Sequence, residues 1–334
     1  MKTISIVSPC FNEEANVEAC YRAVKSLFEG VLSDYAVEHI FVDNASTDRT
    51  IEILRGIADR DRNVKIVINA RNFGPFRSTF NGLRYATGDA VLVMLPVDLQ
   101  DPPELIPEFV RHWEQGIEVV AGARNSREES SVLRRVRHAF YRVVNMLSEF
   151  EIPPDVGEFQ LIDRKVLDAV LMHRDHYPYI RGIIASCGFK RLIIPYTWRA
   201  RERGHSKLNL LNLTDQALNG IFSFTNTPMR LCALTGFLLA IACILFALIS
   251  VITYILDPDL APRGTMTIIV SVLFLSSVQL IFTGILGEYV TSVHAQVRGG
   301  PSVIERERIN IQSPLRRPDQ STASTDLAAE APDL

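Results

Sequence analysis

The chain has 334 residues, of which 47% are hydrophobic and 22% are charged, and its formal net charge is −3. This length allows more than one structural unit, and the near balance of charge gives no overall argument for nucleic-acid binding. The five cysteines lack the spacing of a metal site or a disulfide framework, a pattern typical of reduced thiols in a protein that faces the cytosol.

Residues 1–198 alternate between short apolar runs and segments of helical periodicity. The apolar runs predict strands over residues 3–7, 39–42, 64–68, 91–95 and 117–121. Apolar residues at helical spacing predict helices over residues 14–28, 50–59, 77–86 and 104–115. Strands and helices that alternate in this way form right-handed βαβ units, so we expect an α/β domain with a mostly parallel sheet and helices on both faces.

The apolar run that begins at Val91 ends in a cluster of polar residues. Asp98, Gln100 and Asp101 follow it, and two prolines then keep the chain out of regular structure. Open α/β sheets bind ligands beyond the carboxyl ends of their strands, so a carboxylate here is a candidate ligand-binding group. The alternative is a plain polar turn in which Asp101 caps the helix that begins near Glu104.

Polar residues also follow the second predicted strand. Asp43 stands where an acidic side chain can bind a ribose hydroxyl or a base edge. Asp43 and Asp48 can equally be caps of the helix that begins near Thr50. Neither the Gly-x-Gly-x-x-Gly fingerprint nor the P-loop sequence occurs, so a nucleotide bound at this edge would need other contacts.

Six arginines lie between Arg124 and Arg142, offset only by Glu128 and Glu129. Such a basic run is usually a solvated surface. Its position after a strand of the same sheet favours an anionic ligand instead, because arginine binds phosphate through two parallel hydrogen bonds.

Residues 199–229 differ in character from the preceding domain. Basic residues surround Gly204-His-Ser206, and an amphipathic stretch follows. This pattern predicts a helix that lies on a membrane surface with its cations toward lipid phosphates. The alternative is an ordinary surface helix packed on the core.

Two long uncharged runs, 232–256 and 265–287, dominate residues 230–290. Each is long enough to cross about 30 Å of hydrocarbon as a helix, so this segment is predicted to form a transmembrane hairpin. Arginines flank the outer ends of the pair, whereas the connector carries one, which places the N-terminal domain and the C-terminus in the cytoplasm, at the cell (inner) membrane.

The two ends of the chain fit this topology. Residues 1–10 are not interpreted as a signal peptide, because Asn12, Glu13 and Glu14 interrupt the apolar run and no cleavage-type site follows. Residues 291–312 are expected to form a cytoplasmic segment. Residues 313–334 are rich in Pro, Ser, Thr, Ala and Asp and are predicted to be a disordered tail.

With these segments in order, the chain resembles the family 2 glycosyltransferases that act on polyprenyl phosphates, such as dolichyl-phosphate mannose synthase and undecaprenyl-phosphate glucosyltransferase. The resemblance reaches to about residue 312 and rests on Pro9-Cys-Phe-Asn-Glu-Glu14, Val42-Asp-Asn-Ala-Ser-Thr-Asp48, Arg71-Asn-Phe-Gly74, Asp98-Leu-Gln-Asp-Pro-Pro-Glu104, Gly157-Glu-Phe-Gln-Leu-Ile-Asp-Arg164 and Arg201-Glu-Arg-Gly-His-Ser-Lys207. It implies a GT-A catalytic domain and inverting transfer of a sugar from a nucleotide diphosphate to a polyprenyl (undecaprenyl) phosphate.

The resemblance also implies roles for individual residues. Asp98, with Gln100, would bind a divalent metal, Mg²⁺ or Mn²⁺, which offsets charge on the departing diphosphate. The nucleotide sugar would be bound by Pro9, Asn12, Glu14, Asp43, Arg71, Ser206 and Lys207. The lipid phosphate would be oriented by Arg124 and Arg134. Glu158 would orient the acceptor or act as a base, and Arg201 would close over the diphosphate and the acceptor.

The sequence departs from the family pattern at the metal site. The usual Asp-x-Asp is Pro96-Val-Asp98 here, and Asn44 replaces a second frequent aspartate. The loss of one ligand is compatible with Mg²⁺, which commonly uses one or two carboxylates together with phosphate oxygens and water. Two alternative functions are left open. One is transfer to another lipid or polysaccharide acceptor, and the other, which Pro96 and Asn44 motivate, is a non-catalytic membrane scaffold that binds nucleotide sugars. The donor sugar is not predicted, membrane lipid is an expected partner, and a homo-oligomer is left open.

Overall fold

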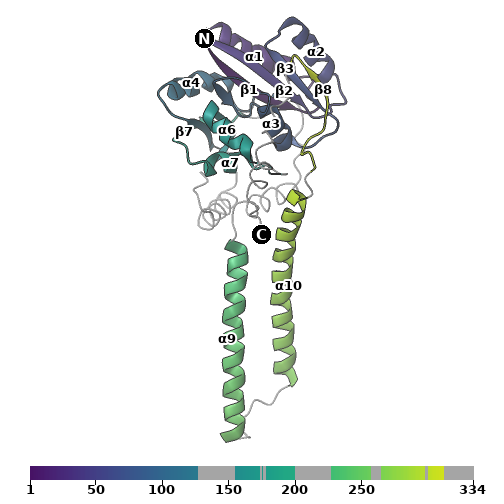
Figure 1. The fold of residues 1–334 in the computed structure, drawn as a ribbon, viewed down its shortest axis with the longest axis vertical. Helices are drawn as coiled ribbons and strands as arrows, with labels where there is room; N and C mark the ends of the chain where they lie inside the picture. The colour runs from purple at the N-terminus through teal and green to yellow at the C-terminus, as the bar shows by residue number, and fades with distance from the viewer. Residues whose placement is uncertain are drawn as a thin grey trace, which may run out of the picture.

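The computed structural model describes residues 1–126, 155–173, 175, 178–199, 227–256, 265–297 and 300–311. Figure 1 shows an α/β domain from which two long helices extend. The predicted surface helix within 200–226, the hairpin connector and the predicted tail lie outside the described residues.

A mixed sheet with the strand order β7-β5-β6-β4-β1-β2-β3-β8 forms the centre of the domain. Its strands are β1 (Lys2–Cys10), β2 (Tyr35–Asp43), β3 (Val64–Asn69), β4 (Ala90–Leu92), β5 (Val119–Ser126), β6 (Val156–Asp163), β7 (Arg191–Thr197) and β8 (Glu305–Ile309). β1 pairs in parallel with β2 and β4, β2 with β3, and β5 with β7. β6 is antiparallel to β4 and β5, and β8 is antiparallel to β3. The predicted α/β domain with a mostly parallel sheet is confirmed.

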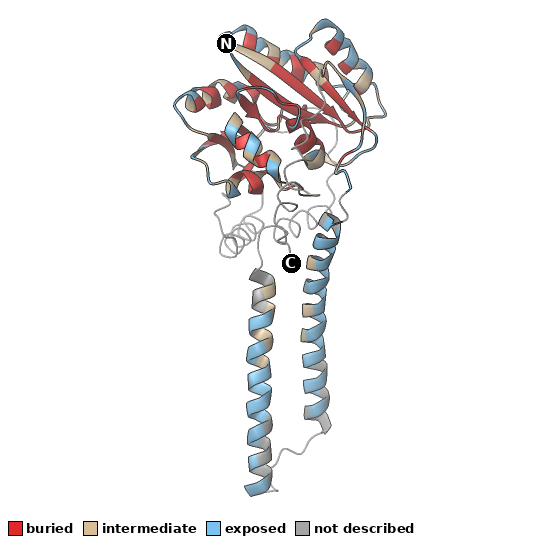
Figure 2. Ribbon diagram, in the orientation of Figure 1, coloured by how far each residue is buried: buried red, intermediate tan, exposed pale blue. Residues whose placement is uncertain are grey.

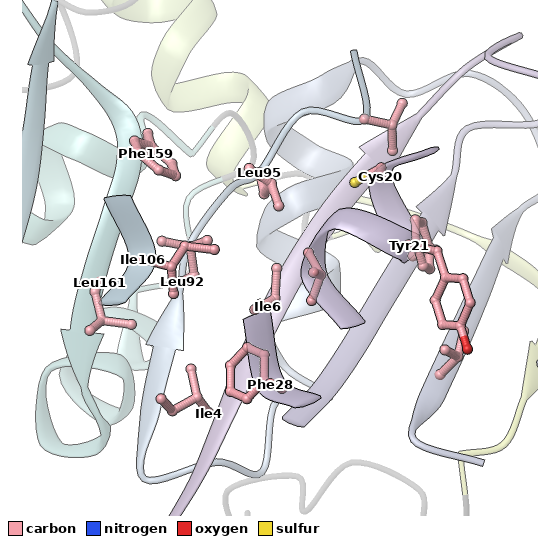
Figure 3. Packing of buried hydrophobic residues seen from close by; sticks show 14 of the residues in the cluster. Ile4, Ile6, Cys20, Tyr21, Phe28, Leu92, Leu95, Ile106, Phe159 and Leu161 are labelled. Carbon is pink, nitrogen blue, oxygen red and sulfur yellow. The ribbon is translucent and has the colours of Figure 1, made fainter. Parts of the chain in front are cut away.

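Helices cover both faces of this sheet. They are α1 (Val17–Glu29), α2 (Thr50–Arg60), α3 (Pro75–Leu83), the short 3₁₀ helix η1 (Pro103–Leu105), α4 (Ile106–Glu114), α6 (Arg164–Met172) and α7 (Ile180–Ser186). One apolar cluster joins the sheet to α1, α2 and α4, and a second joins it to α3, α6 and α7. Figure 2 shows the buried residues concentrated in the strands, and Figure 3 shows the first cluster around Ile6, Phe28 and Leu92.

β4 is shorter than its apolar run. Val91, Val93 and Leu95 are all fully buried, as predicted. Beyond Leu92, however, the N–H of Val93 donates to the Gln160 carbonyl at 2.8 Å, and the N–H of Leu95 donates to the Val7 carbonyl at 2.8 Å. The chain therefore remains between β6 and β1 but leaves the regular ladder, which brings the polar residues after Leu95 to the carboxyl edge of the sheet.

The two predicted apolar spans are helical, as α9 (Thr227–Leu256) and α10 (Thr265–Val297). Within the described residues, Val270–Thr291 is long and apolar enough to cross a membrane, with a mean hydropathy of 1.9, and α9 contains a shorter apolar stretch, Cys232–Phe246. Length and composition thus support one spanning helix, and the second crossing stays a prediction.

Candidate active site

The loops after β1 and β2 are hydrogen-bonded to each other at the carboxyl edge of the sheet. The N–H of Asn12 donates to Ser46 Oγ at 2.9 Å, and Asn12 Oδ1 accepts from the N–H of Thr47 at 2.7 Å. Glu14 Oε2 accepts from the N–H of Arg49 at 3.0 Å. The structure thus brings two predicted nucleotide-binding residues together, and their side chains fix the shape of the adjoining loop.

Asp43, the last residue of β2, stabilises the loop that follows this strand. It is fully buried, and its carboxylate accepts from the Ser46 N–H at 3.0 Å and from the Ser46 hydroxyl. Burial raises the pKa of Asp43, although the hydrogen bonds from Ser46 oppose this shift. Pro9 is buried as well. The alternative cap is present at Asp48, whose Oδ1 accepts from the N–H of Thr50, at the start of α2, at 3.0 Å.

Asn44 joins this loop to the next one. Its Oδ1 accepts from Asn69 Nδ2 at 3.1 Å and from the N–H of Phe73 at 3.0 Å. Asn44 is 3% exposed, so an amide makes both hydrogen bonds without burying a charge. Arg71 lies exposed on the loop formed by residues 70–74, with its guanidinium carbon 4.0 Å from the centre of the Phe73 ring. We call these residues the Arg71 loop.

Asp98 and Gln100 lie together on the loop after β4. Asp98 is half-buried, and its Oδ1 accepts from the N–H of Gln100 at 3.3 Å. Leu99 between them has φ +54°, the left-handed conformation that produces this tight turn. Gln100 is held by Arg199, whose N–H donates to the Gln100 carbonyl at 3.0 Å. Among the residues that the structure describes, no cluster of three or more His, Cys, Asp or Glu side chains could hold a metal.

Asp101, which is buried, and Arg124, which is partly buried, form an ion pair. Asp101 is 2% exposed, and both of its oxygens lie 3.3 Å from Arg124 Nη2. The Tyr196 hydroxyl donates to Asp101 and accepts from Arg124 Nε at 3.2 Å. Burial opposes the charge of Arg124, but Asp101 and Tyr196 outweigh burial and raise its pKa. The alternative interpretation of Asp101 as a helix cap is wrong, because this carboxylate points to β5 and β7 and the helix start has no side-chain cap.

Glu158, on β6, lies beside a second arginine. The side chain of Glu158 is 13% exposed, and its Oε1 is 3.9 Å from Arg181 Nε. Arg181 is fixed by Tyr179, whose hydroxyl accepts at 2.6 Å, and by the Val156 carbonyl at 3.1 Å. Glu158 is also close enough to Arg124 to stabilise that cation. The site therefore has a carboxylate that is oriented by neighbouring arginines.

Comparison with known proteins identifies the family. The model for "Glycosyl transferase family 2" matches residues 5–171, and the model for "GtrB C-terminal hairpin" matches residues 227–293. This chain belongs to glycosyl transferase family 2. Its domain accordingly has the GT-A fold, and its C-terminal part is a hairpin of the second family.

Relatives of this glycosyltransferase match it over nearly their whole length. The uncharacterized glycosyltransferase YkcC of Bacillus subtilis (strain 168) is 33% identical over 317 residues, which cover 95% of this chain and 97% of the relative. The SfII prophage-derived bactoprenol glucosyl transferase of Shigella flexneri is 34% identical over 302 residues, with coverages of 90% and 96%. The solved glucosyl-3-phosphoglycerate synthase from Mycobacterium tuberculosis, in complex with Mn²⁺, UDP and phosphoglyceric acid, is 22% identical with a TM-score of 0.46, over 66% of this chain and 76% of its own.

Four of the predicted site residues of this glycosyltransferase lie outside the described residues: Arg134, Arg201, Ser206 and Lys207. The structure adds others that the sequence did not indicate. Asn69 and Ser46 hold the loops, and Tyr196 holds Asp101. The motif around Asp98 already contained Asp101, but no sequence pattern connects it with a tyrosine on β7.

Proposed function

We propose that this glycosyltransferase transfers a sugar, with inversion, from a nucleotide-diphosphate sugar to a polyprenyl phosphate at the cytoplasmic face of the cell membrane. The bactoprenol glucosyl transferase of Shigella flexneri, similar over 90% of this chain, supports the choice of acceptor. The observation that carries the proposal is the position of the candidate site. Its loops lie at the carboxyl edge of the sheet, and the chain that leaves α10 enters β8 at this same edge.

This position follows from the pairing of β8. Glu305, the first residue of β8, lies opposite Asn69, the last residue of β3. Residues 298–304 alone separate α10 from β8, and such a segment spans at most about 25 Å when fully extended. The carboxyl edge of the parallel strands therefore lies near the end of α10. A site at this edge suits an acceptor whose phosphate lies at a membrane surface and whose chain lies in lipid.

The donor set at this edge fits a divalent metal. Asp98 and Gln100 offer a carboxylate and an amide oxygen, the hard ligands that Mg²⁺ and Mn²⁺ take together with phosphate oxygens and water. The metal, when bound, would supply positive charge for the departing diphosphate. We assign Arg71 to the donor diphosphate because it is an exposed cation on a loop of the same edge.

The acceptor needs little activation. A phosphate monoester has a second pKa of about 6, so it is mostly dianionic at neutral pH and already nucleophilic. Positioning should then dominate catalysis, and we assign Glu158 to orientation of the acceptor at the sugar. Arg124 is paired with Asp101, so we assign it first to holding the loop after β4, and phosphate binding by Arg124, Arg134, Arg201, Ser206 and Lys207 stays a prediction.

The direct test uses the purified full chain in detergent with undecaprenyl phosphate, Mg²⁺ or Mn²⁺, and a panel of labelled nucleotide sugars. We expect a lipid-linked product with one donor or a few donors. Absence of product with every donor, together with no nucleotide binding, would contradict the proposal. Nucleotide-sugar binding without turnover would favour a non-catalytic scaffold, and transfer to an added polysaccharide alone would favour a different acceptor.

A further inference from the structure

The C-terminal strand β8 contains a bulge that redirects one side chain. Along β8, Ile309, Arg308 and Glu307 pair in turn with Ile66, Val67 and Ile68, but the next pair is Glu305 with Asn69. Arg306 is thus the extra residue. In a regular ladder Arg306 would face the same way as Asn69, and the bulge gives that place to Glu305. β-bulges that re-aim a side chain are common next to functional sites.

The redirected Glu305 faces α3 and the turn that follows it. Its Oε1 accepts from Asn81 Nδ2 at 2.5 Å and from the Tyr85 hydroxyl at 2.7 Å, and its Oε2 accepts from Arg308 Nε. The carboxylate is 11% exposed, and both Asn81 and Tyr85 are 4% exposed. Each group is satisfied by the other, so removal of the carboxylate would leave two buried donors without this acceptor.

The residue just before this strand bonds directly to the Arg71 loop. The Ile304 carbonyl accepts from the N–H of Ala70 at 2.8 Å. Asn69, opposite Glu305, donates to Asn44 at 3.1 Å and to Ser78 Oγ, on α3, at 2.9 Å. α3 begins directly after the Arg71 loop, at Pro75. The chain at β8 therefore holds the start of that loop through Ile304 and Ala70. Through Glu305 and Asn81 it also holds the helix that follows the loop, near the C-terminal end of that helix.

We propose that Glu305 is a positioning residue for the donor site, and that β8 couples the geometry of the Arg71 loop to the membrane hairpin. The chain enters β8 from α10 through residues 298–304, so a displacement of the hairpin relative to the domain acts first on Ile304 and Glu305. Donor binding is then strongest when the hairpin holds β8 in place. The contacts that link the Arg71 loop to β8 belong to the fold. The effect of these contacts on nucleotide binding rests on the proposed function.

The experiment uses the full chain in detergent and compares Glu305→Ala, Glu305→Gln and Glu307→Ala. Glu307 is the matched control, because it lies on the same strand but pairs at 2.5 Å with Arg55 of α2, away from α3. The rate of amide hydrogen exchange at residues 70–74 measures how firmly the Arg71 loop is held. Calorimetry measures the Kd for whichever of UDP, GDP and CDP the unaltered chain binds best. Once a donor is identified, KM and kcat are measured separately.

We expect Glu305→Ala to speed exchange at residues 70–74 and to raise the Kd and the KM by about tenfold, with little change in kcat. Glu305→Gln retains an acceptor oxygen for Asn81 and Tyr85 and should restore both readouts, and Glu307→Ala should leave them unchanged. If Glu305→Ala does not fold, Tyr85→Phe removes one of the hydrogen bonds and should give an intermediate effect.

Equal exchange and equal Kd in Glu305→Ala and Glu307→Ala would overturn the proposal, as would a loss confined to kcat. If the unaltered chain binds none of the three nucleotides, the proposed function fails, and the exchange of residues 70–74 still decides whether β8 holds the loop.

Discussion

The side chain of Pro96 is a ring without an atom that can bind a metal, at the position where the family motif usually has a carboxylate. Asp98 is therefore the principal metal ligand that we propose. The Pro96 carbonyl accepts from the N–H of Leu99 at 3.2 Å, and any residue at this position keeps that carbonyl. We therefore expect Pro96→Asp to retain the turn, to keep turnover and to bind Mn²⁺ more tightly.

Asp98→Ala should lower turnover by about a hundredfold or more, because charge stabilisation by a metal is worth several kcal/mol. Mn²⁺ titration and the donor assay measure both effects, and full activity of Asp98→Ala would remove this metal site.

The ion pair of Asp101 and Arg124 is a second residue-scale feature with a clear energetic prediction. Removal of Asp101 leaves Arg124, whose side chain is 21% exposed, without its carboxylate partner. Loss of one partner of a fully buried pair typically costs about 3–5 kcal/mol, which is an upper bound here. Asp101→Ala should therefore lower the thermal unfolding temperature of the full chain strongly. The exposed pair of Glu104 and Arg199, with a distance of 3.3 Å and side chains 61% and 53% exposed, is the control. Glu104→Ala should cost at most about 1 kcal/mol. Equal shifts in the two variants would contradict a structural role for the pair of Asp101 and Arg124.

His39 makes stability depend on pH. It is 2% exposed, it lies 2.9 Å from Ser8 Oγ, and burial lowers its pKa to about 3, against a weak opposing effect of Asp61. An unfolded histidine takes up its proton near pH 6.5, so the stabilising contribution is complete above that pH and is lost progressively as the pH falls toward 3. From pH 7 to pH 5 we expect a loss of about 2 kcal/mol. Unfolding measured at both pH values should show a smaller difference in His39→Gln, and an equal difference would exclude His39 as the cause.

At the scale of elements, periodicity predicted the part of the sheet that is built from βαβ units. β1, β2, β3, α1, α2 and α4 lie where apolar spacing predicted them, because each buries one face or both against a neighbour. β6, β7 and β8 were not predicted, and for β8 the reason is physical. β8 consists of Glu-Arg-Glu-Arg-Ile and is a strand because β3 offers an unpaired edge, which no local pattern reveals.

The sequence predicted the loops of the candidate site but not the hydrogen bonds between their side chains and backbone. Motifs located the loops that carry Asn12, Asp43 and Asp98, since strand ends can be inferred from sequence. The same motifs did not show that the side chain of Asn12 bonds to the backbone of a neighbouring loop, or that Asp43 bonds to the loop that follows its own strand. Hydrogen-bond partners of polar side chains depend on contacts between distant segments, and residue type alone does not fix them.

α3 packs unusually close to the sheet, and this closeness gives a prediction for the element. A Cβ at Gly82 would lie 2.5 Å from Val42 Cγ2 and 2.8 Å from Val7 Cγ1, whereas a Cβ at Gly56 of α2 would meet nothing within 4 Å. Gly82→Ala should destabilise the domain by about 1–3 kcal/mol through overpacking. Gly56→Ala should instead stabilise it by up to about 1 kcal/mol, because alanine favours a helix. Thermal unfolding measures both changes, and a stabilising Gly82→Ala would show that the contact relaxes freely.

For the whole molecule, the pairing of β8 with β3 restricts how the chain can cross a membrane. β3 lies before α9 in the sequence and β8 lies after α10, yet both belong to one sheet. The segments before and after the two helices must therefore lie on the same side of any membrane. If α10 crosses, the α9 segment must return the chain, although the apolar stretch Cys232–Phe246 alone is short for a span.

This restriction predicts a labelling pattern for the full chain in intact cells. A cysteine introduced at Ala261, in the connector between the helices, should react with a membrane-impermeant maleimide added from outside. A cysteine at Ser302, just before β8, should react only after the membrane is permeabilised. The native Cys10 and Cys20 are buried, and a background in which Cys187, Cys232 and Cys243 are replaced by serine isolates the two probes. Labelling of both probes from outside, or of Ser302→Cys alone, would contradict a hairpin with both ends in the cytoplasm. Labelling of neither before permeabilisation would indicate that the helices do not cross.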